Sequence, residues 1–339
     1  MFVVMRANAT EEEILGVKSR ILAEGLTPFA HEGAERTVIA VVGDAGRAHE
    51  RLLNHLAGLA GVEEVTEMRR PFKLTSREFH PEDTVIHVGD VVIGDGSLTV
   101  MAGPCAVESR EQLLETAVAV RDAGATILRG GAFKPRTSPY EFQGLGLKGL
   151  KLLDKARRET GLAIITELLS EDHAEMVAEF TDIIQIGARN AQNFQLLIAA
   201  ARTGKPVLLK RGLSMRIEEW LLAGEYVLSN NNPNLMFCER GIRTFETFTR
   251  NTLDLSAVPI VKKESHCPVV IDPSQGAGRA DLVAAMCKGA IAVGADALLI
   301  EVHPNPAEAW SDGAQQLSLD RFAKLMDELK PFIAAAGRE

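Results

Sequence analysis

From residue 98 onward, apolar runs alternate with helical segments, and this repeat constrains the fold more than any other feature. The runs follow one another every 25 to 35 residues or so, as strand–helix units do. There are eight of them: LTVMAGPCA, TILRGGA, LAIITEL, DIIQIGA, PVLLKRG, NLMFCERG, PVVIDPS and ALLIEVH. They are nearly continuous in Val, Ile and Leu, which is typical of parallel strands buried on both faces. Eight such units favour a closed (β/α)8 TIM barrel over an open doubly wound sheet. We therefore expect an α/β protein with its barrel at residues 98–339.

The first 70 residues follow a different order, which is strand, helix, strand, strand, helix, strand. Thr10 and Glu13 form a capping box at the start of an amphipathic stretch that ends at Gly25. This order predicts a small ferredoxin-like α+β domain at residues 1–70. A polar segment with two prolines then indicates a linker, and a hairpin with a Gly-Asp-Gly turn completes residues 71–97.

Composition narrows the function classes. The chain has 339 residues, enough for a barrel and a smaller domain, and no apolar run approaches the ~20 residues of a membrane span. Its start lacks a basic segment followed by a long apolar run, so we expect a cytoplasmic protein. The four cysteines form no CxxC pair, which argues against a disulfide framework. A net charge of -9 argues against general nucleic-acid binding and makes a local cluster of Arg and Lys informative.

Such a cluster follows the strands. TIM barrels assemble their active sites at the carboxyl ends of the strands. Basic side chains stand at several of these ends: Arg129, Lys134, Arg136, Arg189, Lys210, Arg211, Arg240 and Arg243. One charged strand end could be an ordinary solvated residue, but many like charges on one rim repel one another unless an anion lies between them. The pattern therefore indicates a site for phosphates and carboxylates. Lys134 and Lys210 could instead form Schiff bases, although the neighbouring arginines make anion recognition the simpler interpretation.

A second group combines Cys105, after the first strand, with Glu301 and Asp312, at and after the eighth. The first and eighth strands are neighbours in a closed barrel, so these side chains can meet. The mixture of soft and hard ligands suits Mn, Fe, Co or Zn better than Mg or Ca. The alternative is a buried structural cysteine beside ordinary loop acids.

One motif points to a different function and is set aside. GLGLKG at residues 144–149 fits G-x-G-x-x-G and has Glu167 on the next strand, as a dinucleotide site would. However, it follows KPRTSPYEFQ rather than an apolar strand, so the strand-to-helix turn of that site is missing. We interpret the segment as a flexible loop that covers the barrel site.

Several motifs together resemble one family: GPCAVES, LRGGAFKPRTSPYEFQG, IGARN, VLLKRG, CERGIRTF, DPS and EVHPNP with SDG. They are similar to those of 3-deoxy-D-arabino-heptulosonate 7-phosphate (DAHP) synthase, a transferase, in the type I beta subtype with a ferredoxin-like regulatory domain. The resemblance covers essentially the whole chain, and KPRT is its most specific element. It implies condensation of phosphoenolpyruvate with erythrose 4-phosphate, with release of phosphate, as the first step of the shikimate pathway to aromatic amino acids.

The resemblance also implies roles for individual residues. The residues that would bind phosphoenolpyruvate are Arg129, Lys134, Arg189, Lys210 and Arg240. Those that would reach erythrose 4-phosphate are Arg136 and Thr137. Candidates for moving protons or ordering water are Lys134, Glu167 and His303.

The chain departs from the family pattern at Gln275, where the family has a metal-binding His after D-P-S. An amide oxygen is a weaker and harder ligand than imidazole, so we expect lower metal affinity and a shift of preference toward Mn or Mg. A weaker metal site, a metal-independent enzyme and a catalytically impaired protein are the three possible outcomes. We favour the weaker site, with Cys105, Gln275, Glu301 and Asp312 as ligands, because the other three ligands remain. Mn is the favoured ion, with Fe, Co or Zn as alternatives.

Two other functions compete with this one. A sibling synthase that uses arabinose 5-phosphate to make 3-deoxy-octulosonate 8-phosphate carries K-A-N-R-S where this chain has Lys134-Pro135-Arg136-Thr137. The chain could also be a non-catalytic amino-acid sensor, which only Gln275 supports. The N-terminal domain resembles an allosteric module, which implies feedback inhibition by tyrosine or phenylalanine and a homotetramer. A passive packing domain is the alternative.

Overall fold

The computed structural model describes residues 1–33, 35–43, 49–67 and 70–338. It divides into two units. The first comprises Met1–Asp83 with Lys263–His266, and the second comprises Thr84–Lys262 with Cys267–Glu339.

The second unit is a closed parallel barrel, as the repeat of apolar runs predicts. Its strands are β7 (Thr99–Gly103), β8 (Ile127–Arg129), β9 (Ala163–Glu167), β10 (Ile183–Ile186), β11 (Val207–Lys210), β12 (Leu235–Glu239), β13 (Val269–Ile271) and β14 (Ala297–Glu301). Parallel pairing of β14 with β7 closes the cylinder. The first and eighth strands are therefore neighbours, which is the condition for Cys105 and Glu301 to meet.

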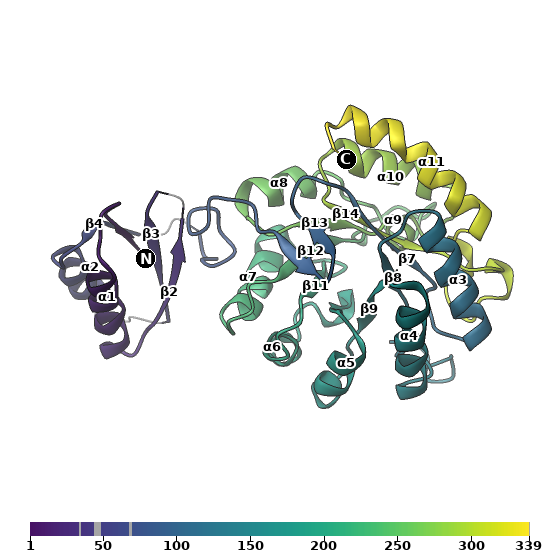
Figure 1. Cartoon of the computed structure of the whole chain (residues 1–339), viewed down its shortest axis with the longest axis horizontal. Coiled ribbons are helices and arrows are strands. Elements are labelled where there is room, and N and C mark those ends of the chain that lie inside the picture. Colours follow the sequence, from purple (N-terminus) through teal and green to yellow (C-terminus); the bar gives the residue numbers. More distant parts are fainter. Residues whose placement is uncertain (34, 44–48, 68–69, 339) are drawn as a thin grey trace. The chain divides into compact units, whose positions relative to one another are not determined.

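Helices surround this cylinder (Figure 1). They are α3 (Arg110–Asp122), α4 (Leu147–Thr160), α5 (Ala174–Phe180), α6 (Phe194–Arg202), α7 (Ile217–Leu228), α8 (Ala257–Glu264), α9 (Pro273–Ala277), α10 (Val283–Ala292) and α11 (Leu319–Ala335). The final helix begins where the Ser318 side chain accepts a hydrogen bond from the Arg321 backbone, and it buries Phe322, Leu325 and Leu329. That spacing places the three side chains on one helical face. The sixth crossover, where helical periodicity is poor, is a long loop followed by the short α8.

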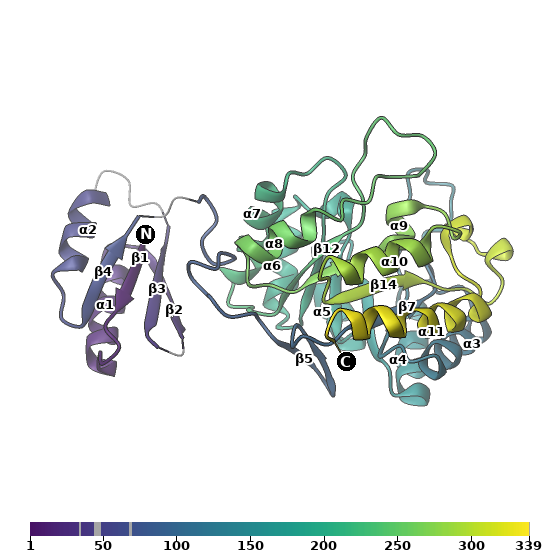
Figure 2. The same ribbon diagram turned by 90° about the horizontal axis from the view of Figure 1, so that it is seen from above.

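A hairpin closes one end of the barrel. Its strands are β5 (Ile86–Val88) and β6 (Val91–Ile93), and Figure 2 shows β5 at the end of the cylinder. Ile86 and Ile93 are fully buried in the same apolar cluster as the barrel interior, which stabilises each by about 1.5–3 kcal/mol relative to exposure. The prediction of a Gly-Asp-Gly turn is wrong. The two residues of the hairpin turn are Gly89 and Asp90, and Gly89 has a φ of 59°. Glycine tolerates that left-handed conformation, which two-residue hairpin turns require.

The first unit is a four-stranded antiparallel sheet in the order β2-β3-β1-β4 with two helices. Its elements are β1 (Phe2–Met5), α1 (Glu11–Ala23), β2 (Thr27–Glu32), β3 (Thr37–Val42), α2 (His49–Ala57) and β4 (Val62–Thr66). The Thr10–Glu13 capping box is present. Val3, Ile21, Ile39 and Leu56 are among the residues of its core. This is the ferredoxin-like α+β arrangement that the order of elements predicts.

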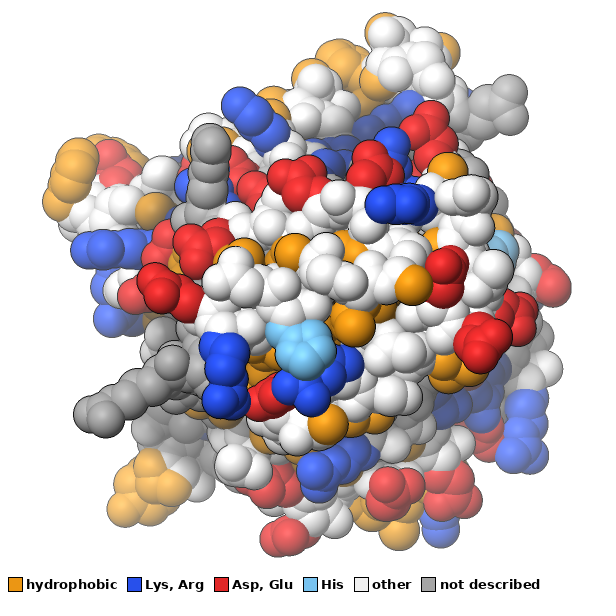
Figure 3. All heavy atoms as spheres, turned by 90° about the vertical axis from the view of Figure 1, so that its left-hand side faces the viewer, with side chains coloured by type: hydrophobic (Ala, Val, Ile, Leu, Met, Phe, Trp, Pro, Cys, Tyr) orange, Lys and Arg blue, Asp and Glu red, His pale blue; other side chains and the backbone are white. Residues whose placement is uncertain are grey.

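The charged side chains on the surface and the length and polarity of the helices agree with the composition. On the face drawn in Figure 3, acidic and basic side chains are interspersed. Among the described residues, no helix combines the length and apolar character that crossing a membrane requires.

Candidate active site

A cavity of about 250 Å³ lies among the residues that follow the barrel strands. The seven basic and polar residues expected to bind substrates all line it: Arg129, Lys134, Arg136, Thr137, Arg189, Lys210 and Arg240. Glu167, Gln275 and Asp312 line it as well. The strand ends therefore bring the expected residues together in one hollow.

Two of the cations are buried and paired with buried acids. The Arg129 guanidinium lies 2.6 Å from Glu301, and the Lys210 ammonium lies 2.6 Å from Asp272. Burial alone would lower the pKa of Arg129, but the charge of Glu301 raises it, so this guanidinium stays charged. Each acid is completely buried. Removing one partner of such a pair leaves an uncompensated charge, which costs about 3–5 kcal/mol.

Cys105, Glu301 and Asp312 also come together. Their ligand atoms lie within 4.8 Å of one another, and Cys105 Sγ is 3.3 Å from Asp312 Oδ2. Asp312 has a φ of 51°, a left-handed conformation that Asp tolerates better than most residues. Soft thiolate beside two carboxylates is a donor set for a divalent transition metal, so these three residues fit the expected ion.

Charges around this cluster set its protonation. Burial and the charge of Glu301 raise the pKa of Cys105 to about 12, although Lys134, whose Nζ is 3.1 Å from Sγ, opposes the shift. Burial would also raise the pKa of Glu301, but the positive charges of Arg129 and Lys134 outweigh it and lower that pKa to about 2. The cluster thus contains an ionised carboxylate and a thiol. The thiol must release its proton when a metal ion binds to the sulfur.

Gln275 contacts this cluster with its amino group rather than its oxygen. Its Oε1 accepts a hydrogen bond from Arg240 at 2.9 Å, and its Nε2 donates to Glu301 at 3.2 Å. Arginine can only donate, so Arg240 fixes the orientation of the amide. The fourth expected ligand therefore directs a donor at the carboxylate. It would have to rotate and lose the bond to Arg240 before its oxygen could bind a metal.

The three residues expected to move protons do not all lie in the cavity. Lys134 and Glu167 line the cavity, and Glu167 accepts a hydrogen bond from Gln185 at 3.4 Å. His303 is not among the described residues that line it. Its Nε2 lies 3.2 Å from Glu108, and its Nδ1 accepts from the Asn305 backbone at 3.0 Å. Both ring nitrogens are occupied by protein groups.

Three further residues contact the site, and no motif of the sequence assigns a role to any of them. Arg250, in the loop before α8, donates to Asp312 at 3.1 Å and to Gln315 at 2.9 Å. Gln315 in turn donates to Glu301 at 2.6 Å. Glu141 accepts from Arg136 at 3.0 Å at the mouth of the cavity. No spacing in the sequence indicates these contacts, because each depends on how a loop folds back over the barrel.

Two basic residues near strand ends do not line the cavity. Arg211, directly after Lys210, bonds to Glu239 and Asp254, each at 2.9 Å. Successive side chains along a strand point to opposite faces, so only one of the adjacent pair can face the site. Arg243 is absent from the lining formed by the described residues.

These features are typical of a TIM-barrel enzyme that acts on phosphorylated or carboxylated anions, with a Cys and carboxylate cluster beside its cationic cavity. Residues 72–335 match the DAHP synthetase I family, and residues 1–70 match the DAHP synthase ferredoxin-like domain. The chain belongs to this family and is an enzyme of it, which confirms the fold and the family expected from the sequence.

Similar proteins support the same assignment. The phospho-2-dehydro-3-deoxyheptonate aldolase of Thermotoga maritima is 52% identical over 337 residues, which cover 99% of both chains. Its crystal structure matches 100% of this chain and 98% of its own, with a TM-score of 0.79 and 51% identity. A truncated form of the Thermotoga maritima synthase matches 79% of this chain and 98% of its own, with a TM-score of 0.75 and 53% identity. The 2-dehydro-3-deoxyphosphooctonate aldolase of Caulobacter vibrioides is 36% identical and covers 70% of this chain and 89% of its own.

Proposed function

We propose that the chain condenses phosphoenolpyruvate with erythrose 4-phosphate to give DAHP and inorganic phosphate, the first step of the shikimate pathway. The observation that carries this proposal is the single cavity in which several buried or half-buried cations converge. Two substrates that both carry phosphate need such a site, because fixed guanidinium and ammonium groups offset the repulsion between their charges.

The cations divide between the two substrates. The residues proposed to hold the phosphate and carboxylate of phosphoenolpyruvate are Arg129, Lys134, Arg189, Lys210 and Arg240. Arg136 and Thr137 are proposed to receive the phosphate of erythrose 4-phosphate. Arg136 bonds to the exposed carboxylate of Glu141, and the substrate phosphate would displace that carboxylate.

The reaction requires C3 of phosphoenolpyruvate to attack the sugar aldehyde, water to add at C2, and the resulting hemiketal phosphate to release phosphate. Lys134 and Glu167 are the cavity residues proposed to move the protons of these steps. Lys134 holds its ammonium 2.9 Å from the Cys105 carbonyl oxygen, which fixes its position in the cavity. His303 is not proposed for this role, since Glu108 and the Asn305 backbone occupy its nitrogens.

We propose that Cys105, Glu301 and Asp312 hold a divalent metal ion, with Mn favoured. When bound, the ion would polarise and orient the sugar aldehyde. Because the Gln275 oxygen faces Arg240, we propose that this site is weaker than one with an imidazole at position 275. Activity should then be lost on chelation and restored by Mn.

The ferredoxin-like domain is proposed to bind an aromatic amino acid, tyrosine or phenylalanine, and the chain to work as a homotetramer. The family match of residues 1–70 supports a regulatory role for this domain. Deleting residues 1–70 should abolish feedback inhibition and leave turnover intact. Inhibition that survives the deletion would refute this part of the proposal.

The sibling activity on arabinose 5-phosphate is the alternative. The octulosonate-type relative in Caulobacter vibrioides covers 70% of this chain, whereas the heptonate-type relative covers 99%. This difference in coverage favours erythrose 4-phosphate.

One experiment tests the function directly. Phosphate release from phosphoenolpyruvate is measured with erythrose 4-phosphate, with arabinose 5-phosphate and with both, alongside the metal content. We expect release with erythrose 4-phosphate and a large loss in Arg189→Ala. The matched control is Arg202→Ala, which changes an exposed arginine on α6 outside the cavity and should retain activity. No release from either aldehyde with Mn present would instead support the sensor alternative.

A further inference from the structure

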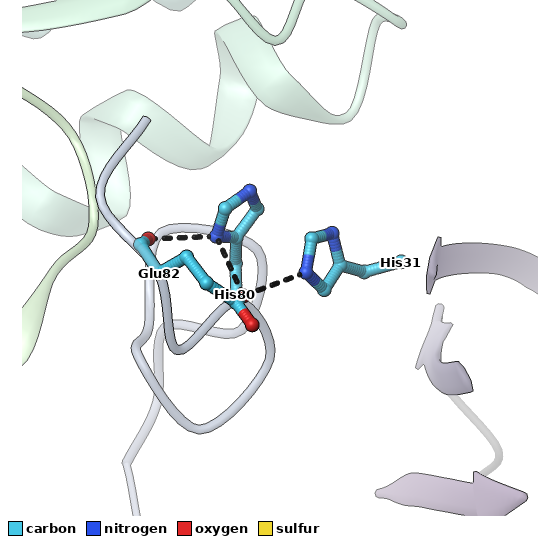
Figure 4. A group of neighbouring side chains, drawn as sticks. All are labelled: His31, His80 and Glu82. Carbon is cyan, nitrogen blue, oxygen red and sulfur yellow. Dashed lines mark hydrogen bonds and ion pairs between the residues drawn. The ribbon is translucent and has the colours of Figure 1, made fainter. Parts of the chain in front are cut away.

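The first unit contains a second group of side chains that can bind a metal. His31 lies on β2, and His80 and Glu82 lie on the segment that follows β4. In Figure 4, both imidazoles direct a ring nitrogen toward the Glu82 side chain. His31 Nε2 is 3.1 Å from Glu82 Oε2, and His80 Nδ1 is 3.9 Å from the same oxygen.

We propose that His31, His80 and Glu82 form a binding site for a divalent transition metal of the zinc class. In a tetrahedral zinc site with bonds near 2.0–2.1 Å, neighbouring ligand atoms lie about 3.3 Å apart. The two observed separations from the Glu82 oxygen fall on either side of that value, and all three ligand atoms lie within 4.8 Å of one another. Small side-chain movements can therefore bring the three atoms onto one ion.

The chemistry of the ligands selects the kind of metal. Two imidazole nitrogens and one carboxylate oxygen suit Zn²⁺, Co²⁺, Ni²⁺ or Cu²⁺, whereas Mg²⁺ and Ca²⁺ prefer sites made of oxygen. Three protein ligands leave the fourth tetrahedral position for water or another small ligand. The side chains of His31 and Glu82 are 18% and 50% exposed, so an ion can enter from solvent.

Neighbouring groups hold the middle ligand in place. The His80 ring stacks on His31 at 3.8 Å and on His266 at 4.3 Å. His266 is buried and its Nε2 is bonded to the Leu74 carbonyl at 2.7 Å, so one side of the stack is fixed. This support reduces the side-chain freedom that metal binding would remove.

Metal binding must replace two existing interactions. His80 Nδ1 donates to the Glu82 carbonyl at 2.8 Å, so a metal can bind at Nδ1 only when the neutral ring carries its proton on Nε2 instead and that hydrogen bond is lost. The stacked rings of His31 and His80 make an angle of 29°, so one ring must also turn for both nitrogens to face the same ion. The bound ion would then connect β2 to the segment around residue 80, both within the first unit.

Cobalt tests this proposal in the full-length protein, because its visible absorption reports the ligands. The Cys105 cluster would complicate the titration, so the measurement is made in a Cys105→Ser background. A thiolate ligand gives a charge-transfer band that nitrogen and oxygen ligands lack. We expect this background to bind one equivalent of Co²⁺ without that band and to release it to Zn²⁺.

Ligand variants then locate the bound ion. In the same background, both His31→Ala and Glu82→Gln should lose the equivalent of Co²⁺, and His55→Ala, an exposed histidine on α2, should retain it. Glu82→Gln keeps the size of a half-exposed side chain, so it gives the answer even if a histidine variant fails to fold. The proposal is overturned if the Cys105→Ser protein binds no cobalt, or if Glu82→Gln binds it as tightly as its parent.

Discussion

Replacing Gln275 with histidine should strengthen metal binding and weaken the metal-free protein at the same time. The amide bonds to two charged groups, Arg240 at 2.9 Å and the buried Glu301 at 3.2 Å. Hydrogen bonds to charged groups contribute about 1.5–3 kcal/mol each. An imidazole can keep at most one of these bonds as it approaches the cluster, so Gln275→His should lose roughly 1.5–3 kcal/mol of stability without metal.

The same change should raise metal affinity. Imidazole binds Mn, Fe, Co and Zn better than an amide oxygen does, and the Gln275 oxygen is committed to Arg240. Outer groups that merely orient a ligand change affinity by about 10–100-fold, so an added ligand should strengthen binding by at least that factor. Competition with a chelator measures the affinity, and denaturant unfolding with and without metal measures the stability.

Gln275→Glu serves as the matched comparison, since it keeps the length of the side chain and places a second carboxylate next to Glu301. It should lose stability without metal because the two carboxylates repel each other. If Gln275→His binds Mn no more tightly than the parent chain, position 275 does not face the ion and the proposed metal centre is misplaced.

Two further predictions concern residues outside the metal-binding cluster, Glu141 and His266. Glu141→Gln removes the carboxylate that competes for Arg136, so the KM for erythrose 4-phosphate should fall about two- to fivefold with kcat unchanged, as steady-state kinetics would reveal; a raised KM would contradict it. Burial lowers the pKa of His266 from 6.5 to about 3, so the unfolded state binds the extra proton first as pH falls. The contribution of the neutral His266 side chain to the free energy of unfolding is therefore complete above pH 6.5. It is lost as the pH falls toward 3, and the loss at pH 5 is roughly 2 kcal/mol. Urea unfolding should show that the free energy of unfolding is smaller at pH 5 than at pH 7.5, and His266→Gln should reduce this difference. An equal difference in both proteins would mean that His266 is not its source.

The fold was predictable because each element carries its own local signal. Eight apolar runs give eight strands, and the Thr10–Glu13 box marks the start of α1. The sequence does not decide the hairpin turn, because the segment contains two Gly-Asp pairs, at residues 89 and 94, and either can form a turn. Only the packing of Ile86 and Ile93 into the barrel decides between them.

Side-chain direction was harder to predict than position along the chain. Barrel strands are apolar on both faces, so the sequence does not reveal that Lys210 faces the cavity and Arg211 does not. His303 follows a strand end as the cavity residues do. Its partner Glu108, however, comes from a loop that is far away in the sequence. Arg250 reaches Asp312 from a loop with no periodic pattern. In each case a tertiary contact decides, and one sequence contains no signal for it.

The paired charges also explain how a crowded cationic rim can exist before any substrate binds. The inner pairs, Arg129–Glu301 and Lys210–Asp272, have side chains at most 6% exposed. The outer pairs, Arg136–Glu141 and Arg250–Asp312, each include a side chain exposed by 40% or more. Water screens the outer pairs, so exchanging the Glu141 carboxylate for a substrate phosphate costs little, whereas breaking an inner pair costs several kcal/mol.

A substrate anion should therefore join the inner pairs rather than separate them. A guanidinium has five donors, and Glu301 engages one nitrogen of Arg129, which leaves donors for a phosphate or carboxylate. At Arg136, the Glu141 carboxylate lies where we propose that the phosphate of erythrose 4-phosphate binds. The inner acids thus hold the buried cations in place, and Glu141 holds Arg136 at the cavity until a phosphate replaces the Glu141 carboxylate.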